Sequence, residues 1–303
     1  MLDETTAQQS AGRSGVGGPD FFCVGAQKAG TGWLYEQLRA HPDFWMPPLK
    51  ELHYFDRLPN TNQNSPARTV PLARKTNDRL EIARQSAADD RDRHFLDAIE
   101  RFYANPSFDL GGYARLFSEK ASLISGDITP GYSLLSDRLI AQIASYFPNL
   151  KVIFIARDPV ERAWSQLSMY VRRGLIDPFD VGDLDTVTNH LRRPEVAARS
   201  HPSEIVARWR SHVRPELFKI YFFDDLKLNP AALRAAIVTF LGGNPGKPSG
   251  NLSPEHNAKA QKRKLPLPDS MRLHLAQFFE GELKRSADEL AGPAREWPAR
   301  YGF

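Results

Sequence analysis

A glycine-rich loop near the N-terminus has the residue types of a phosphate-binding site. The apolar run 21–24 is followed by "GAQKAGTG", with Lys28 before the second glycine and Thr31 after it. Glycines let the backbone approach a guest closely, and a following helix N-terminus attracts an anion. An ATP-binding P-loop instead has Gly-Lys-Ser/Thr. The loop predicts a phosphate site of a different kind, and a plain Gly-rich turn is the alternative.

A second stretch, "FIARDPVERAWSQ", offers a second anion grip. Arg157 ends an apolar run, and Ser165 follows eight residues later, about two helical turns on, on the face of Asp158 and Glu161. A guanidinium suits phosphate geometry, and a hydroxyl can complete the contact. Alternatively, Arg157 pairs with one of the two carboxylates. Taken with the first loop, the stretch predicts a ligand that carries two separate phosphate groups.

The elements that must hold these loops alternate along the chain. Expected strands are 20–25, 122–127, 151–157 and 217–226; expected helices are 31–42, 136–148, 158–174, 202–213, 229–242 and a long final helix, 268–290. Segment 50–56, "KELHYFD", reads as a short strand or turn. The alternation predicts an α/β fold, a parallel β-sheet flanked by helices on both faces. Ligands of such sheets bind beyond the carboxyl ends of the strands, where both loops begin.

One domain is expected over residues 20–303. Residues 1–19 are polar and Gly/Ser-rich, which is typical of a disordered tail. Residues of about 57–108 are polar and contain several prolines, so they read as an insertion that forms a lid, a binding segment or disorder. The stretches 80–85 and 94–103 within it could be helical.

Composition narrows the possible partners. The net charge is +4 and the pI about 9.1, which weakly favours a polyanionic ligand. No basic tract is interleaved with aromatic residues, so no nucleic-acid partner is expected. No apolar stretch is long enough to span a bilayer and the N-terminus has no apolar signal region, so a cytoplasmic location is expected by default. Oligomeric state is left open.

Metal and thiol chemistry have little support in the sequence. Cys23 is the single cysteine, so no intrachain disulfide can form, and its apolar surroundings favour a buried hydrophobe. No Cys/His cluster has zinc spacing. Asp127 ends an expected strand, but the hydroxyl partner that would share a magnesium ion is misplaced. No metal is therefore expected.

These stretches together resemble the sulfotransferases that use 3′-phosphoadenosine 5′-phosphosulfate (PAPS), especially the heparan sulfate branch, and suggest a bacterial member. "GAQKAGTGWL" resembles the 5′-phosphosulfate loop of the family, "RDPVERAWSQ" the 3′-phosphate motif, "KELHYFD" the segment with the catalytic base, "DITPGYSLL" a Thr/Ser-Pro-x-Tyr segment, and "QKRKLP" a late basic loop. The matches occur in the family order and span 21 to about 266. The resemblance implies a P-loop-like fold and a PAPS donor that needs no metal.

The resemblance also implies individual roles. Glu51 would be the general base for a hydroxyl acceptor, a small molecule, lipid or carbohydrate, with His53 as a lesser participant. Lys28 would stabilise the charge that grows on the leaving phosphate. An extended segment would place Glu51, His53 and Phe55 on one face. The implied donor-binding residues are Lys28, Ala29, Gly30, Thr31, Gly32, Trp33, Arg157, Ser165, Lys262 and Arg263.

The sequence departs from the heparan-type pattern at one position, and two other functions are possible. Heparan-type enzymes have a lysine where this chain has Ile128 after Asp127, which argues for a different acceptor. A P-loop kinase or NTPase is the alternative enzyme, and the misplaced lysine argues against it. A nucleotide-binding protein without catalysis is the third possibility, and it would tolerate loss of Glu51.

Overall fold

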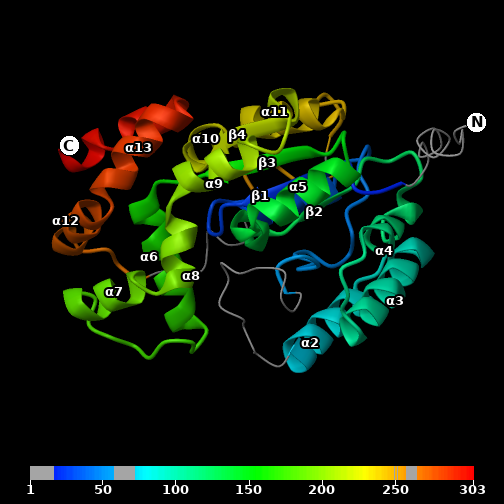
Figure 1. Ribbon diagram of the computed structural model, residues 1–303, viewed down its shortest axis with the longest axis horizontal. Coiled ribbons are helices and arrows are strands. Elements are labelled where there is room, and N and C mark those ends of the chain that lie inside the picture. Colours follow the sequence, from blue (N-terminus) through cyan, green and yellow to red (C-terminus); the bar gives the residue numbers. More distant parts are fainter. Residues whose placement is uncertain (1–16, 58–71, 249, 251, 257–264) are drawn as a thin grey trace, which may run out of the picture.

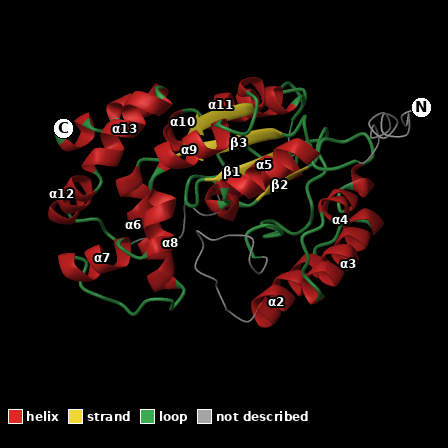
Figure 2. Ribbon diagram, viewed as in Figure 1, coloured by secondary structure: helices red, strands yellow, loops and turns green. Residues whose placement is uncertain are grey.

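The computed structural model describes residues 17–57, 72–248, 250, 252–256 and 265–303, without the side chains of 72–76. Its centre is a sheet of four parallel strands, which Figure 2 shows side by side with helices around them. They are β1 (Phe21–Gly25), β2 (Gly126–Ile128), β3 (Lys151–Ala156) and β4 (Phe218–Phe222), in the order β2-β1-β3-β4. All five residues of β1 are buried. The predicted α/β sheet is confirmed.

Helices cover both faces of this sheet. From β1 the chain crosses to β2 on one side of β1, and it then crosses back to β3 on the other side. Because such crossovers are right-handed, α1 (Thr31–Arg39) and α5 (Asp137–Tyr146) lie on opposite faces of the sheet. Helix α1 contacts α11 (Pro230–Leu241), and α5 contacts α9 (Pro202–Arg210). The same topology brings the carboxyl ends of β1 and β3 together, because these strands are direct neighbours.

Two helices have the local chemistry that the sequence predicts. Helix α6 (Pro159–Arg172) begins after Asp158, whose carboxylate accepts from the amide of Val160 at 2.9 Å. Helix α11 begins after Asn229 and ends at Gly242, where φ is 99°. An Asx cap, a proline at the first turn and a left-handed glycine at the end stabilise such helices in any tertiary context.

The segment after residue 71 contributes two helices to the body of the protein. These are α2 (Leu72–Gln85) and α3 (Asp90–Ala104), which lie together at the right of Figure 1. They include the stretches 80–85 and 94–103 that were expected to be helical. The ring of Phe95 packs on Trp45, and Trp45 donates to Asp92 at 3.1 Å. A short helix, α4 (Leu110–Arg115), follows.

The segment 268–290 differs from the single long helix that was expected there. It divides into α12 (Asp269–Phe278) and α13 (Glu280–Leu290) at the buried Phe279. The break lets α12 contact α6 and α13 contact α9. The expected strand 217–226 is also shorter, because β4 leads directly into α10 (Phe223–Leu228). Two short helices, α7 (Leu184–Leu191) and α8 (Pro194–Ala197), lie between α6 and α9.

Other expectations concern burial and the chain termini. Cys23 is fully buried, and burial raises its pKa to about 12. It therefore packs in the core as a small hydrophobic side chain, as predicted. Residues 1–16 of the expected tail lie outside the described residues, whereas Gly18 accepts a hydrogen bond from Lys120 at 2.8 Å. Across the part of the chain that is described, no helix is long and apolar enough to cross a bilayer.

Candidate active site

The glycine-rich loop turns sharply between β1 and α1. Lys28 has φ 75° and Gly30, which precedes α1, has φ 91°. A side chain at Gly30 would be strained at this φ and would collide with Leu226. Thr31 begins α1 and is buried, and Leu34 donates to the Gly30 carbonyl at 3.0 Å. The loop therefore presents the start of a nine-residue helix at the carboxyl end of the sheet.

Arg157 joins this loop to the neighbouring strand end. Its Nη1 donates to the carbonyl of Lys28 at 2.6 Å, and its Nη2 bonds the Glu161 carboxylate at 3.1 Å. The guanidinium also lies over the Phe223 ring, with Cζ 4.3 Å from the centroid. Its buried Nε has no hydrogen-bond partner among the described residues. The pairing with Glu161, which was the alternative to a phosphate contact, is thus present, and Arg157 also bonds the glycine-rich loop.

The other expected donor-binding residues fall in three places. Ala29 is fully buried and Gly32 is buried in α1. Trp33, also in α1, donates to the Pro254 carbonyl at 2.7 Å, which ties the helix to the segment 252–256. Ser165 is partly exposed on α6. Lys262 and Arg263 lie outside the described residues.

The segment with Glu51 and His53 forms a chain of charged contacts. The Glu51 carboxylate is 2.7 Å from the Lys50 ammonium and 3.6 Å from His53 Nε2. His53 Nδ1 is 2.9 Å from the Asp56 carboxylate. Glu51 therefore pairs with Lys50 and also contacts His53. Sequence reasoning missed Asp56, although its i,i+3 spacing from His53 in "HYFD" suits such a pair.

The charges in this chain stabilise one another. Burial raises the pKa of Glu51, but Lys50 and His53 outweigh it and hold that pKa well below its usual value. For His53, burial lowers the pKa, yet the carboxylates of Asp56 and Glu51 outweigh burial and the pKa is raised. Burial likewise raises the pKa of Asp56, and His53 reverses the effect. At neutral pH, Glu51 and Asp56 are therefore ionised.

The segment was predicted to be a short strand or turn, and the structure has a turn, so the extended geometry that would put Glu51, His53 and Phe55 on one face is wrong. Glu51 and His53 have φ values of 61° and 53°, and Phe55 is fully buried rather than on a shared face with them. Left-handed φ values cost free energy in residues other than glycine, so tertiary contacts must hold them. A turn, rather than strand alternation, brings Glu51 and His53 together.

Residues distant in sequence supply those contacts. Arg79 of α2 donates through Nη2 to the carbonyls of Lys50 and Glu51, the latter at 3.0 Å. Tyr103 of α3 donates to the Leu52 carbonyl at 2.6 Å. The amide of Tyr54 donates to the Tyr132 hydroxyl at 3.1 Å. Helices α2 and α3 thus hold the backbone around the candidate base.

Arg79→Ala is expected to loosen this backbone. Loss of a charged donor to two carbonyls should speed hydrogen exchange of the Tyr54 amide about 10-fold, since such bonds contribute about 1.5 kcal/mol or more. Hydrogen exchange read by mass spectrometry measures this. Arg84→Ala is the matched control, because Arg84 lies on the same helix and pairs with Asp97 and Glu100 of α3. Equal exchange in both variants would mean that α2 packing, not the Arg79 bond, protects the segment.

Asp127 is buried and its carboxylate accepts hydrogen bonds from three hydroxyl groups. It is 1% exposed, and its carboxylate accepts from Thr129 at 2.6 Å, Tyr132 at 2.7 Å and Tyr113 at 2.9 Å. Ile128 beside it is buried. Within the described ranges, no three His, Cys, Asp or Glu side chains gather as metal ligands would.

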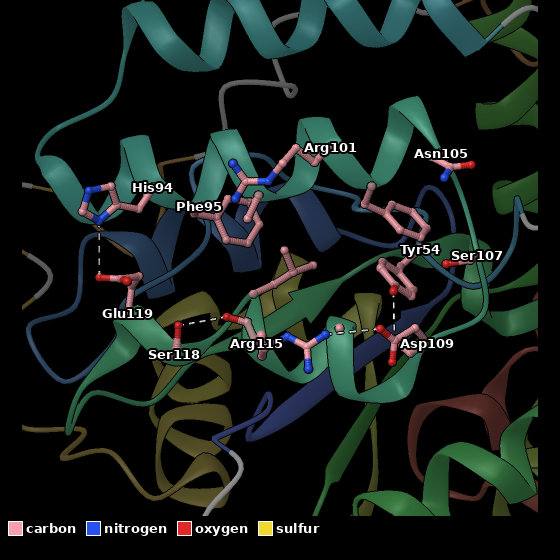
Figure 3. Close-up of a pocket in the computed structure, with 14 residues that line it drawn as sticks. Tyr54, His94, Phe95, Arg101, Asn105, Ser107, Asp109, Arg115, Ser118 and Glu119 are labelled. Carbon is pink, nitrogen blue, oxygen red and sulfur yellow. Dashed lines mark hydrogen bonds and ion pairs between the residues drawn. The ribbon is translucent and has the colours of Figure 1, made fainter.

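A cavity of about 540 Å³ lies between α3 and α4, as Figure 3 shows. Tyr54 lines it and donates to the Asp109 carbonyl at 2.9 Å. The cavity also holds the His94–Glu119 and Arg115–Asp109 pairs. Lys28, Glu51, Arg157 and Ser165 do not line it. This cavity is therefore distinct from the predicted site residues, whose roles stay predictions.

Comparisons with known proteins bear on the family. Residues 19–244 match the model of the sulfotransferase family. A sulfotransferase structure from Alicyclobacillus acidocaldarius is similar, with 21% identity, a TM-score of 0.61, and coverage of 92% of this chain and 98% of that one.

Two further structures are more distant. The sulfotransferase domain of the Synechococcus PCC 7002 olefin synthase shares 16% identity with a TM-score of 0.47, over 87% of this chain and 94% of that one. The domain from the curacin biosynthetic pathway has the same identity and TM-score, over 87% and 98%. No curated protein sequence matches significantly. Because the family model covers 226 of 303 residues, the chain belongs to the sulfotransferase family.

Proposed function

We propose that this protein transfers a sulfuryl group from PAPS to a hydroxyl acceptor, a small molecule, lipid or carbohydrate. The observation that carries the proposal is the bond from Arg157 to the Lys28 carbonyl. It joins two cationic loops at adjacent strand ends, as a ligand with a 5′-phosphosulfate and a separate 3′-phosphate requires. Cytoplasmic action is part of the proposal.

The residues present suit such a donor. Lys28 and the α1 N-terminus with Gly30, Thr31 and Gly32 would hold its 5′ end, and Ala29 and Trp33 would shape that loop. No acidic side chain occurs from Gly25 to Trp33 to repel an anion. Arg157, whose Nε has no partner among the described residues, and Ser165 would hold the 3′-phosphate, and Lys262 and Arg263 would add charge from the late loop. The donor supplies the sulfuryl group and a phosphate leaving group.

Two residues would then act in the chemical step. Lys28 places its cation where negative charge grows on the leaving oxygen, an interaction that is strongest in the transition state. Glu51 accepts the proton of the acceptor hydroxyl. His53, held by Asp56 at 2.9 Å, orients the Glu51 carboxylate, and Lys50 together with His53 keeps that carboxylate ionised.

The pH dependence of turnover distinguishes the two candidate bases. A base must be deprotonated, so with Glu51 as the base turnover should fall only below pH 4.5 and stay level from pH 6 to 9. With His53 as the base, turnover would instead rise with pH above 6.5, as the imidazole loses its proton. A kcat–pH profile decides between them, and a rise above pH 6.5 that His53→Gln abolishes would assign the role to His53.

The alternatives have less support. A P-loop kinase or NTPase needs an acidic magnesium ligand at a strand end, whereas Asp127 is buried and occupied by three hydroxyl donors. A binding protein without catalysis would not need the left-handed Glu51 and His53 that α2 and α3 hold in place. The buried Ile128 supports an acceptor unlike heparan sulfate.

A direct assay tests the proposal. The protein is incubated with PAPS and a panel of phenols, sugars and lipid alcohols, and release of adenosine 3′,5′-bisphosphate is measured against an acceptor-free control. Acceptor-dependent release without magnesium is the expected result. Turnover of ATP with magnesium, and none of PAPS with any acceptor, would favour the kinase or NTPase.

A further inference from the structure

The C-terminal residues Trp297, Arg300 and Tyr301 form a clasp on two aspartates. They lie in the short turns after α13, at the red end of the chain in Figure 1. The Tyr301 hydroxyl donates to Asp158 Oδ2 at 2.8 Å, and Arg300 Nη1 is 3.7 Å from the same oxygen. Arg300 Nη2 donates to Asp224 Oδ1 at 2.5 Å, and Trp297 donates to Asp224 Oδ2 at 3.3 Å.

One aspartate is the chain neighbour of Arg157 itself, and the other is the chain neighbour of a ring that Arg157 contacts. Asp158 follows Arg157 directly and caps the start of α6. Asp224 follows Phe223, whose ring lies under the Arg157 guanidinium. The clasp therefore secures both the backbone that carries Arg157 and the ring on which its side chain lies.

The contacts with Asp158 matter because its carboxylate is buried and depends on them. Asp158 is 1% exposed, and burial raises its pKa to about 6 although the Tyr301 hydroxyl opposes the shift. A buried carboxylate that loses a donor tends to move or to become protonated. Trp297 is fully buried and packs edge-on against Phe222 at 6.1 Å, which anchors the clasp to β4.

We propose that the clasp positions Arg157 for the 3′-phosphate of the donor, so that Tyr301 and Arg300 are positioning residues for donor binding. This inference rests on the proposed function. The clasp residues lie beyond residues 19–244, which the family model matches, and Tyr301 bonds Asp158 across 143 positions. It acts through the aspartates and touches no nucleotide itself.

The test compares adenosine 3′,5′-bisphosphate with adenosine 5′-phosphate, which lacks the 3′-phosphate. Tyr301→Phe and Arg300→Gln should each weaken bisphosphate binding about 2- to 30-fold, the usual range for residues that act indirectly. Affinity for adenosine 5′-phosphate should stay unchanged. Isothermal calorimetry measures both.

Matched controls separate positioning from general effects. Tyr221→Phe removes a hydroxyl that donates to the Ala236 carbonyl, and Arg295→Gln removes an exposed charge from the C-terminal end of the chain. Neither should alter binding. In an Arg157→Ala background, Tyr301→Phe should add no further loss, whereas a merely structural residue would still weaken both nucleotides.

The outcomes are distinguishable. If the wild-type protein binds both nucleotides equally, the 3′-phosphate assignment and the proposed donor fail. If it discriminates but the clasp variants discriminate equally well, or lose both nucleotides together, the clasp has no positioning role. If Arg300→Gln fails to fold, Tyr301→Phe, which deletes a single oxygen, carries the same test.

Discussion

Replacing Glu51 by glutamine is expected to lower turnover by about 10²–10⁴-fold, the usual contribution of a general base. Glutamine keeps the shape of the side chain and removes the proton acceptor. Donor affinity should barely change, because Glu51 is proposed to contact the acceptor. Steady-state kinetics with PAPS and the best acceptor of the panel give turnover, and calorimetry gives donor affinity.

Two comparisons sharpen this experiment. Glu280→Gln also removes a carboxylate that pairs with a lysine, at 2.6 Å from Lys284, but in α13, and it should leave turnover unchanged. His53→Ala should cost less than Glu51→Gln, since His53 orients the base. Near-normal turnover of Glu51→Gln would move the base to His53. An equal loss of donor binding would make Glu51 structural.

Arg157→Ala should weaken binding of adenosine 3′,5′-bisphosphate by about 10- to 150-fold, or about 1.5–3 kcal/mol, because a charge-assisted grip on phosphate is lost. Adenosine 5′-phosphate should bind nearly as before. Arg157→Lys keeps the charge without the planar fork, so it should recover only part of the loss. Calorimetry on both nucleotides measures the two affinities.

The arginine also supports the loop through the Lys28 carbonyl, so specificity for the 3′-phosphate is the decisive readout. Arg173→Ala, an exposed arginine at the far end of α6, is the control for net charge and should bind as wild type does. A loss shared equally by both nucleotides would indicate that Arg157 merely holds the loop.

Local chemistry explains which parts of the fold the sequence could predict. Asp158 with Pro159, and Asn229 with Pro230 and Gly242, specify helix ends through contacts within a few residues. Strands β1 and β3 are short, buried apolar runs that end where the loops begin. Such features depend little on what the rest of the chain does.

The site depends on contacts between distant residues, which the sequence pattern does not contain. Arg79 donates to the Glu51 carbonyl from 28 positions away. The residues of the segment itself do not contain this contact, so they leave both a strand and a turn open. Arg157 meets the Lys28 carbonyl across 129 positions, because β1 and β3 are neighbours in the sheet. Alternating strands and helices predict a parallel sheet without fixing that order.

One nucleotide with a 3′-phosphate is proposed to bridge the loops at Lys28 and Arg157. Calorimetry of the wild-type protein with adenosine 3′,5′-bisphosphate, in the presence of a chelator and again with magnesium, tests it most directly. Binding should be the same in both conditions and about 10- to 150-fold tighter than that of adenosine 5′-phosphate, since the 3′-phosphate adds charge-assisted bonds. Equal affinity for the two nucleotides, or binding that requires magnesium, would contradict the claim.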